Sequence, residues 1–242
     1  ALTDLGETGG GHVIGDTTRD SDLALWADVL RNAPLVAGGS GLATSLAQCH
    51  MAGQPAQALA PPRGGNDGNT LILAGSCSKT TLAQIETFRS QGGQCIHLDP
   101  LACGREDDHV NTLLTKVSDI LKSTPVLVYA SGTPQSVQAV QEKFGREQAG
   151  ALIEAAFAEI ARQAVPLPQT KRLVVAGGET SGAVVSALGI AALQIGPEID
   201  PGVPWTLALD TDGNIILPMA LKSGNFGAMD FFCKTLKLES PA

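Results

Sequence analysis

The chain has 242 residues with 43% hydrophobic content, and its 16 basic and 24 acidic residues give a net charge of −8. This length is enough to bury the core of one large domain or two small ones. The lack of any basic block argues against a nucleic-acid partner, and no apolar run reaches the roughly 18 residues that a membrane span needs.

The five cysteines are scattered along the chain without any C-x-x-C spacing. Neither a zinc site nor a disulfide framework is therefore expected, and free thiols in a reducing compartment are favoured. The opening stretch ALTDLGETGGGH has no basic region and no apolar core, so it is not a signal peptide. We expect a cytoplasmic protein. Because the chain begins without methionine in a loop-like stretch, we also expect it to be part of something longer.

Strand-like and helix-like segments alternate along most of the chain. Short apolar runs predict strands at 12–18, 34–40, 69–76, 94–100, 125–131, 171–178 and, as a strand or a bent edge, 191–199. Helices are predicted between them at about 20–30, 42–52, 81–91, 109–123 and 134–165, the last broken near Gly145. Residues 53–69 are rich in Pro, Gly and Asn and predict a surface loop or a short linker.

The C-terminal part has a different pattern. VPWTLAL and NIILPMA, separated by DTDG, predict a β-hairpin with its turn at Asp212-Gly213. A last amphipathic helix is predicted after KSGNFG and runs to about Leu238. The fold class is therefore predicted to be α/β, with a doubly wound, mostly parallel sheet and an antiparallel hairpin near the C-terminus.

Four predicted strands end in a similar way, with an alanine followed by glycine and serine or threonine: LVAGGSG at 35–41, LILAGSCS at 71–78, LVYASGT at 127–133 and LVVAGGET at 173–180. The carboxyl ends of parallel strands lie on one edge of a sheet, so these loops are expected to line a single crevice. Glycine allows close approach to a ligand, and helix N-termini offer amides to phosphate oxygens. A tight turn explains any one loop equally well, but four such endings favour a ligand-binding edge.

None of the common phosphate-binding fingerprints is present. The stretch GSCSKT lacks the glycine before Lys79 that a Walker A loop needs, and Thr44 stands where a dinucleotide-binding loop needs its third glycine. A nicotinamide oxidoreductase is therefore the least favoured alternative. Asp99 is expected to serve a turn, and the four histidines show no metal-ligand spacing. No G-x-S-x-G sequence indicates a hydrolase.

Two segments leave alternatives open. In GGET at 177–180, Glu179 and Thr180 either cap a helix or contact the ribose, a phosphate or a metal-bound water, with Gly177 and Gly178 bordering a nucleotide. The segment KSGNFG at 222–227 is either a clamp for a phosphate or base edge, or a helix cap that begins with a solvated lysine.

The motifs GGSGLA, AGSCSKTT, VVAGGETSGAV and LPMALKSGNFG, taken together, resemble the C-terminal nucleotide-binding domain of the four-carbon acid sugar kinases. The resemblance covers nearly the whole chain from about His12. It implies a kinase that uses ATP and Mg²⁺ to phosphorylate threonate, erythronate or 3-oxo-tetronate, usually at the terminal hydroxyl. No metal-binding side chain is assigned, and the ATP-binding residues that the resemblance implies are Ser76, Ser78, Gly177, Gly178, Glu179, Thr180, Gly224 and Gly227.

One departure from the family concerns its N-terminal domain, which binds the sugar acid, supplies catalytic carboxylates and begins with an Asp-Asp-x-Thr-Gly-Ala type motif. No such motif occurs here. Residues 1–33 are therefore predicted to be a linker and remnant of that domain, and 34–242 the nucleotide-binding domain. Because phosphoryl transfer needs both partners positioned, this half is expected to bind ATP but to transfer little phosphate.

An alternative function and a homodimer are also considered from the sequence. The chain could instead be a non-catalytic module that binds another phosphorylated metabolite in the same crevice. It could also form a homodimer, for which the apolar helix face from Ala151 to Ala164 is the candidate contact.

Overall fold

The computed structural model describes residues 15–53, 69–103, 109–130, 132 and 134–237. It divides into two compact units, Ala1–Ala58 and Leu59–Ala242, and each is described by itself. Within the described residues, no helix is both long enough and apolar enough to cross a membrane.

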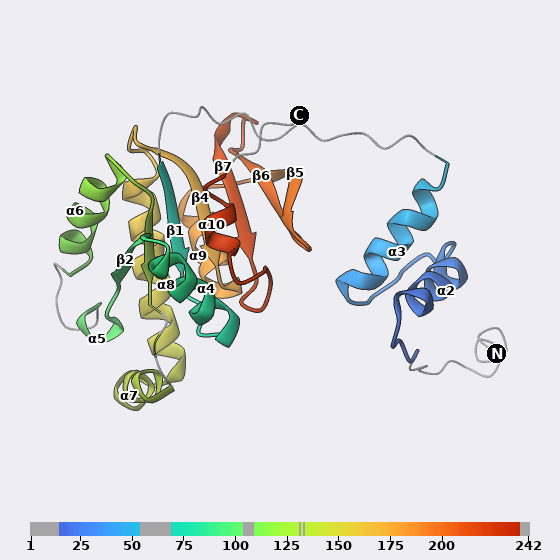
Figure 1. Cartoon of the computed structure of the whole chain (residues 1–242), viewed down its shortest axis with the longest axis horizontal. Coiled ribbons are helices and arrows are strands. Elements are labelled where there is room, and N and C mark those ends of the chain that lie inside the picture. Colours follow the sequence, from blue (N-terminus) through green and yellow to red (C-terminus); the bar gives the residue numbers. More distant parts are fainter. Residues whose placement is uncertain (1–14, 54–68, 104–108, 131, 133, 238–242) are drawn as a thin grey trace. The chain divides into compact units, whose positions relative to one another are not determined.

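The described part of the first unit contains two helices that pack together, α2 (Asp20–Leu30) and α3 (Ser40–Met51) (Figure 1). The prediction of a buried strand at 34–40 is wrong, because residues 34–39 are irregular and the Leu35 side chain is 86% exposed. Residues 15–18 of the strand predicted at 12–18 are irregular as well, and 12–14 lie outside the described residues. A strand needs a partner for its backbone hydrogen bonds, and residues 15–53 provide none.

The second unit is built on a seven-stranded sheet with the order β2-β3-β1-β4-β7-β6-β5 (Figure 1). Neighbouring strands run parallel among β2, β3, β1, β4 and β7, whereas β6 is antiparallel to both of its neighbours, β7 and β5. The predicted fold class is thus confirmed, with the hairpin joined by a third strand at the sheet edge. The strands are β1 (Asn69–Ala74), β2 (Gln94–His97), β3 (Val126–Tyr129), β4 (Thr170–Ala176), β5 (Ala192–Asp200), β6 (Val203–Leu209) and β7 (Ile215–Lys222).

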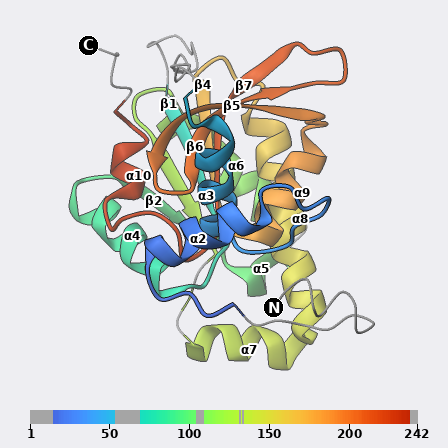
Figure 2. The same cartoon turned by 90° about the vertical axis from the view of Figure 1, so that its right-hand side faces the viewer.

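Helices cover both faces of this sheet, so apolar residues along each central strand point alternately into two cores. In β1, Leu71 packs into the core formed with α6, α8 and α9, whereas Ile72 packs into the core formed with α4 and α10. Figure 2 shows α7 and α8 as separate helices that meet at an angle, as the break predicted near Gly145 requires. The helices are α4 (Lys79–Ser90), α5 (Pro100–Cys103), α6 (His109–Leu121), α7 (Pro134–Phe144), α8 (Arg146–Ala164), α9 (Gly178–Ala187) and α10 (Phe231–Lys234).

Two expectations about helices need correction. The apolar face of Ala151–Ala164 does not offer a subunit contact, because Phe157 and Ile160 are fully buried in the core against the sheet. The last helix is a single turn, α10, rather than a segment that continues to about Leu238. Its phenylalanines are nonetheless fully buried in the opposite core, which explains the amphipathic pattern.

The path of the chain changes direction between two neighbouring strands. From β1 it continues through α4 to β2 on one side, and from β4 it continues through α9 to β5 on the other side. The helices α4 and α9 also lie on opposite faces of the sheet. The carboxyl ends of β1 and β4 therefore flank a topological switch point, which is where open α/β sheets bind their ligands.

Candidate functional site

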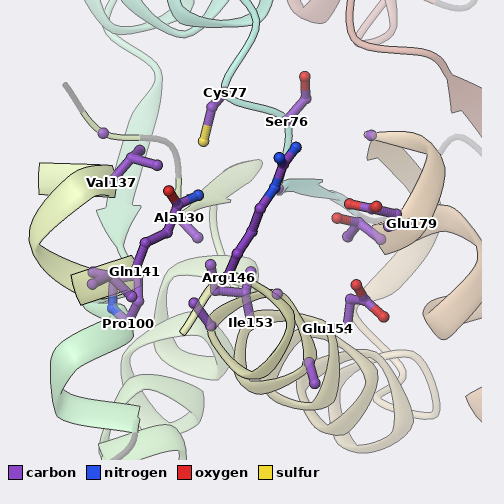
Figure 3. A pocket seen from close by; sticks show the side chains of 18 of the residues that line it. Ser76, Cys77, Pro100, Ala130, Val137, Gln141, Arg146, Ile153, Glu154 and Glu179 are labelled. Carbon is purple, nitrogen blue, oxygen red and sulfur yellow. The ribbon is translucent and has the colours of Figure 1, made fainter. Parts of the chain in front are cut away.

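A pocket of about 1130 Å³ lies at this switch point (Figure 3). Its volume is slightly above the roughly 300–1,000 Å³ typical of small-molecule sites, so there is room for a nucleotide. One wall consists of the loops that follow β1, β3, β4 and β7, and the other of α5, α7 and α8. The residues of the first wall are Gly75, Ser76, Cys77, Ala130, Gly132, Gly177, Gly178, Glu179, Thr180 and Gly224.

Three of the four similar strand endings therefore meet at one pocket, as expected. The fourth, at 35–41, does not end a strand and belongs to the other compact unit. The loop after β7 takes its place, because β7 rather than any N-terminal strand lies beside β4 in the sheet.

Backbone hydrogen bonds hold these loops against each other. The amides of Gly75 and Ser76 donate to the Ala176 carbonyl at 3.0 and 3.2 Å, and the Gly177 amide donates to the Lys222 carbonyl at 2.9 Å. Gly177 has a φ of +127°, and a Cβ there would lie 3.1 Å from the Ser76 amide nitrogen. These amides thus join neighbouring strand ends, and the absence of a side chain at Gly177 serves this contact between loops.

The N-terminus of α9, in contrast, is open to the pocket. Its N-cap is Gly177, which offers no side-chain cap, and the first intrahelical bond runs from the Ser181 amide to the Gly177 carbonyl at 2.9 Å. The amides of 178–180 therefore lack intrahelical acceptors. A Cβ at Gly178 would meet no atom within 4 Å, and both Gly178 and Glu179 are exposed. This end of the helix, with the positive end of its dipole, suits an anionic group.

Thr180 lines the same pocket but is 4% exposed. Its hydroxyl oxygen occupies the space where a Cβ on Gly75 would be, so Gly75 leaves room for Thr180. The threonine therefore joins the loops after β1 and β4 in addition to forming part of the pocket wall.

The serines after β1 lie in different surroundings. Ser76 lines the pocket, and its hydroxyl accepts a hydrogen bond from the Ser78 amide at 3.2 Å. Ser78 is not part of the lining and is the N-cap of α4: its hydroxyl accepts from the Thr81 amide at 3.1 Å and donates to the Gly224 carbonyl at 2.6 Å. The structure thus places Ser78 in a connection between α4 and the loop after β7.

The segment KSGNFG does not begin with a solvated lysine, as one of its two expected arrangements required. Lys222 is 2% exposed, and its Nζ donates at 3.1 Å to the Thr81 hydroxyl and to the carbonyls of Ser223 and Gly224. Burial lowers the pKa of this amine to about 8. The lysine is therefore neither solvated nor part of the pocket lining.

Gly227 also lies outside the lining of the pocket. It has a φ of +82°, its carbonyl accepts from Gln84 Nε2 at 3.0 Å, and a Cβ there would lie 2.9 Å from the Phe231 ring. Of this segment, only Gly224 reaches the pocket.

The second wall contains residues that the sequence motifs did not indicate. Arg146, Glu147 and Glu154 come from α8, and Gln141 comes from α7. No local sequence pattern distinguishes them, since they reach the site through the packing of α8 beside α9.

The end of β2 also contributes to the pocket. His97 and Asp99 line it, and Asp99 also serves the turn expected of it, because its Oδ1 accepts a hydrogen bond from the Leu101 amide at 2.9 Å. Burial lowers the pKa of His97, against the opposing effect of the nearby Asp99 carboxylate. The position of both residues at the carboxyl end of a predicted strand was the signal that could have identified them.

The lining contains carboxylates but no preformed metal centre. Within the described residues, no group of three or more His, Cys, Asp or Glu side chains could hold a metal ion. Mg²⁺ usually binds nucleotide phosphates and waters with only one or two protein carboxylates, and Glu179 at the start of α9 supplies one at the pocket. The residues present thus fit an ion that arrives with a nucleotide.

Comparison with known proteins identifies the domain that contains this pocket. Residues 71–232 match the family model of the nucleotide-binding C-terminal domain. The chain is 44% identical over 229 residues to the 3-oxo-tetronate kinase of Burkholderia multivorans and 42% identical over 231 residues to that of Cupriavidus necator. Each alignment covers 93% of this chain and 51% of the relative. The chain thus spans about half the length of the curated relatives that it matches.

Solved structures give the same result for the fold. A Salmonella typhimurium LT2 protein matches with a TM-score of 0.78 and 33% identity, over 97% of this chain and 54% of the other. A Haemophilus influenzae protein of the DUF1537 family matches with a TM-score of 0.73 and 33% identity, over 96% and 54%. The resemblance to the four-carbon acid sugar kinases is confirmed, and the chain belongs to the family of nucleotide-binding C-terminal domains.

Proposed function

We propose that this chain is the ATP-binding half of a kinase that phosphorylates a four-carbon sugar acid at its terminal hydroxyl. The substrates that fit the proposal are threonate, erythronate and 3-oxo-tetronate, the last of which names the kinases that resemble the chain. The observation that carries the proposal is the uncapped N-terminus of α9, which opens into a nucleotide-sized pocket at the switch point of the sheet.

In this proposal the phosphates of ATP bind against the first turn of α9. Gly178 has no side chain to block their approach, and the Ser76 hydroxyl lines the adjoining part of the pocket. Glu179 is placed to contact the ribose or a water bound to Mg²⁺. When bound, Mg²⁺ supplies neutralisation of phosphate charge. Ser78 and Gly227, which resemble the family's ATP-binding positions, would act indirectly by holding the loops that form the pocket.

The remaining parts of the kinase are proposed to lie in the other half of the whole protein. The sugar-acid site and the catalytic base belong there, because the residues assigned here all concern the nucleotide. We retain the prediction that residues 1–33 are a remnant of that half. The compact unit to which they belong extends to Ala58.

Two further features remain predictions. A cytoplasmic location agrees with the use of ATP and with five free cysteines, which a reducing compartment preserves. We also retain the prediction of a homodimer, with a contact other than the helix face first considered for it, which is buried in the core.

The first test is the affinity of the 242-residue chain for Mg-ATP, measured by isothermal titration calorimetry. We expect saturable binding, and a decrease in affinity of about tenfold or more in Gly178→Leu, because a leucine there fills the space that the phosphates need. The matched control is Gly182→Leu, on an exposed position of the same helix where a Cβ also meets no atom within 4 Å. It should bind ATP like the unsubstituted chain.

Absence of ATP binding at millimolar concentration would contradict the proposal, as would equal affinity of the two variants. A binding module for another phosphorylated metabolite would be indicated by stronger thermal stabilisation of the chain with a sugar phosphate than with ATP.

A further inference from the structure

The charges in the pocket are unevenly distributed. Four carboxylates line it, and Arg146 is the only lysine or arginine among the lining residues that the structure describes. The triphosphate of ATP carries several negative charges, so a cation in the pocket would strongly increase the affinity of the site for ATP. The carboxylates come from Asp99, Glu147, Glu154 and Glu179.

Arg146 reaches the pocket because of the break between α7 and α8. Gly145 adopts a φ of +78° there, and Arg146 is the first residue of the new helix. Figure 3 shows its side chain extended into the pocket, with the guanidinium directed toward the loop that carries Ser76. The side chain is exposed, and no hydrogen bond or ion pair to another described residue occupies the guanidinium.

The two lysines nearest to the phosphate-type motifs are not available for the same role. Lys222 is buried and donates to a hydroxyl and two carbonyls. Lys79, the first residue of α4, is exposed but does not line the pocket. Arg146 is therefore the side-chain cation that the tertiary structure directs into the site.

We infer that Arg146 binds the triphosphate of the nucleotide, an inference that depends on the proposed ATP site. A guanidinium presents its N–H groups as a planar fork, which pairs with two phosphate oxygens. The first turn of α9 lies on the other wall of the same pocket, so the phosphates would be held between helix amides and this arginine. The role is one of binding and positioning, and the base of the nucleotide makes no contribution to it.

The experiment compares three ligands on the 242-residue chain: Mg-ATP, adenosine and inorganic tripolyphosphate. In Arg146→Gln the affinity for ATP and tripolyphosphate should fall about tenfold or more, as for the loss of a hydrogen bond to a charged group, while the affinity for adenosine stays within about twofold. Arg146→Lys should retain part of the ATP affinity, because it keeps the charge and loses the fork. The matched control is Arg162→Gln on the same helix, where the arginine pairs with Glu159 outside the pocket.

The possible outcomes separate clearly. Unchanged ATP affinity in Arg146→Gln would overturn the inference and leave the proposed ATP site standing. An equal loss of ATP and adenosine affinity would also overturn it, since the arginine would then contact the base. If the unsubstituted chain bound no nucleotide, the proposed function would fail and this inference with it. Thermal unfolding of Arg146→Gln should match that of the unsubstituted chain, because the replaced side chain is exposed.

Discussion

At the scale of single residues, the glycines around the pocket serve two different purposes. Gly177 and Gly224 allow loops to approach each other: a Cβ at Gly224 would clash with the Ser76 hydroxyl and lie 3.2 Å from Ser78 Cβ. Gly178 has no such neighbour and leaves space only toward the pocket. Of the two glycines expected to border a nucleotide, only Gly178 therefore has free space beside it, because other parts of the protein lie against Gly177.

Lys222 should make the stability of the fold depend on pH. Burial lowers its pKa to about 8 from the ordinary value of 10.5, so the unfolded chain binds more protons at this site between those two values. The free energy of unfolding should therefore rise with pH in that window. Relative to Lys222→Met, the unsubstituted chain should gain about 1–3 kcal/mol between pH 8 and pH 10.5.

Urea denaturation of both proteins at several pH values measures this difference. Lys79→Met, which removes an exposed lysine at the start of α4, serves as the control and should give a curve parallel to that of the unsubstituted chain. A Lys222→Met curve that is also parallel would show that the amine does not have a lowered pKa.

At the scale of elements, the two helices that begin at the switch point, α4 and α9, differ in how their N-termini are capped. The first turn of α4 is capped by its own Ser78, whereas α9 begins at glycines without a side-chain cap. The cap of α4 also reaches the Gly224 carbonyl, which lies 146 residues away in the sequence. One helix end is thus used to assemble the pocket wall, and the other remains available to a ligand.

Ser78→Ala should destabilise the protein because it removes the cap from the Thr81 amide and a hydrogen bond to the Gly224 carbonyl. The expected loss in the free energy of unfolding is about 1–2 kcal/mol, as for other N-cap serines. Chemical denaturation measures it. Ser90→Ala, at the C-terminal end of the same helix where the hydroxyl donates to the Thr87 carbonyl, should change stability by less than about 0.5 kcal/mol. Equal effects of the two substitutions would argue that Ser78 does not connect the loops.

At the scale of the whole molecule, the sheet and the pocket lie within one compact unit. All seven strands and all lining residues fall within Leu59–Ala242. This unit has its own cores on both faces of the sheet.

We therefore expect residues 59–242, expressed alone, to fold cooperatively and to bind ATP within about twofold of the affinity of the 242-residue chain. Circular dichroism on heating and calorimetric titration test the two parts of this prediction. Loss of cooperative unfolding in the shorter chain would show that the first unit is needed for the fold. Retained folding with a much weaker ATP affinity would show that the first unit contributes to the site.

The sequence predicted local features well and failed where a segment depends on distant partners. The hairpin turn at Asp212-Gly213 and the break at Gly145 follow from glycine conformation, which is local. The run at 34–40 has the composition of a buried strand, but described residues around it in the chain provide no strand to pair with it. Composition alone predicts the tendency to extend and says nothing about a hydrogen-bonding partner.

The sequence by itself determined the alternation of strands and helices, the mostly parallel sheet and the small residues at the strand ends. These follow from hydrophobic periodicity and from turn residues that act over a few positions. Only the tertiary structure decided that β7 lies beside β4, that Lys222 is buried, and that Arg146 enters the pocket from a different helix. The reason is that strand order and helix packing bring together residues that are far apart along the chain, and no local pattern encodes which of them meet.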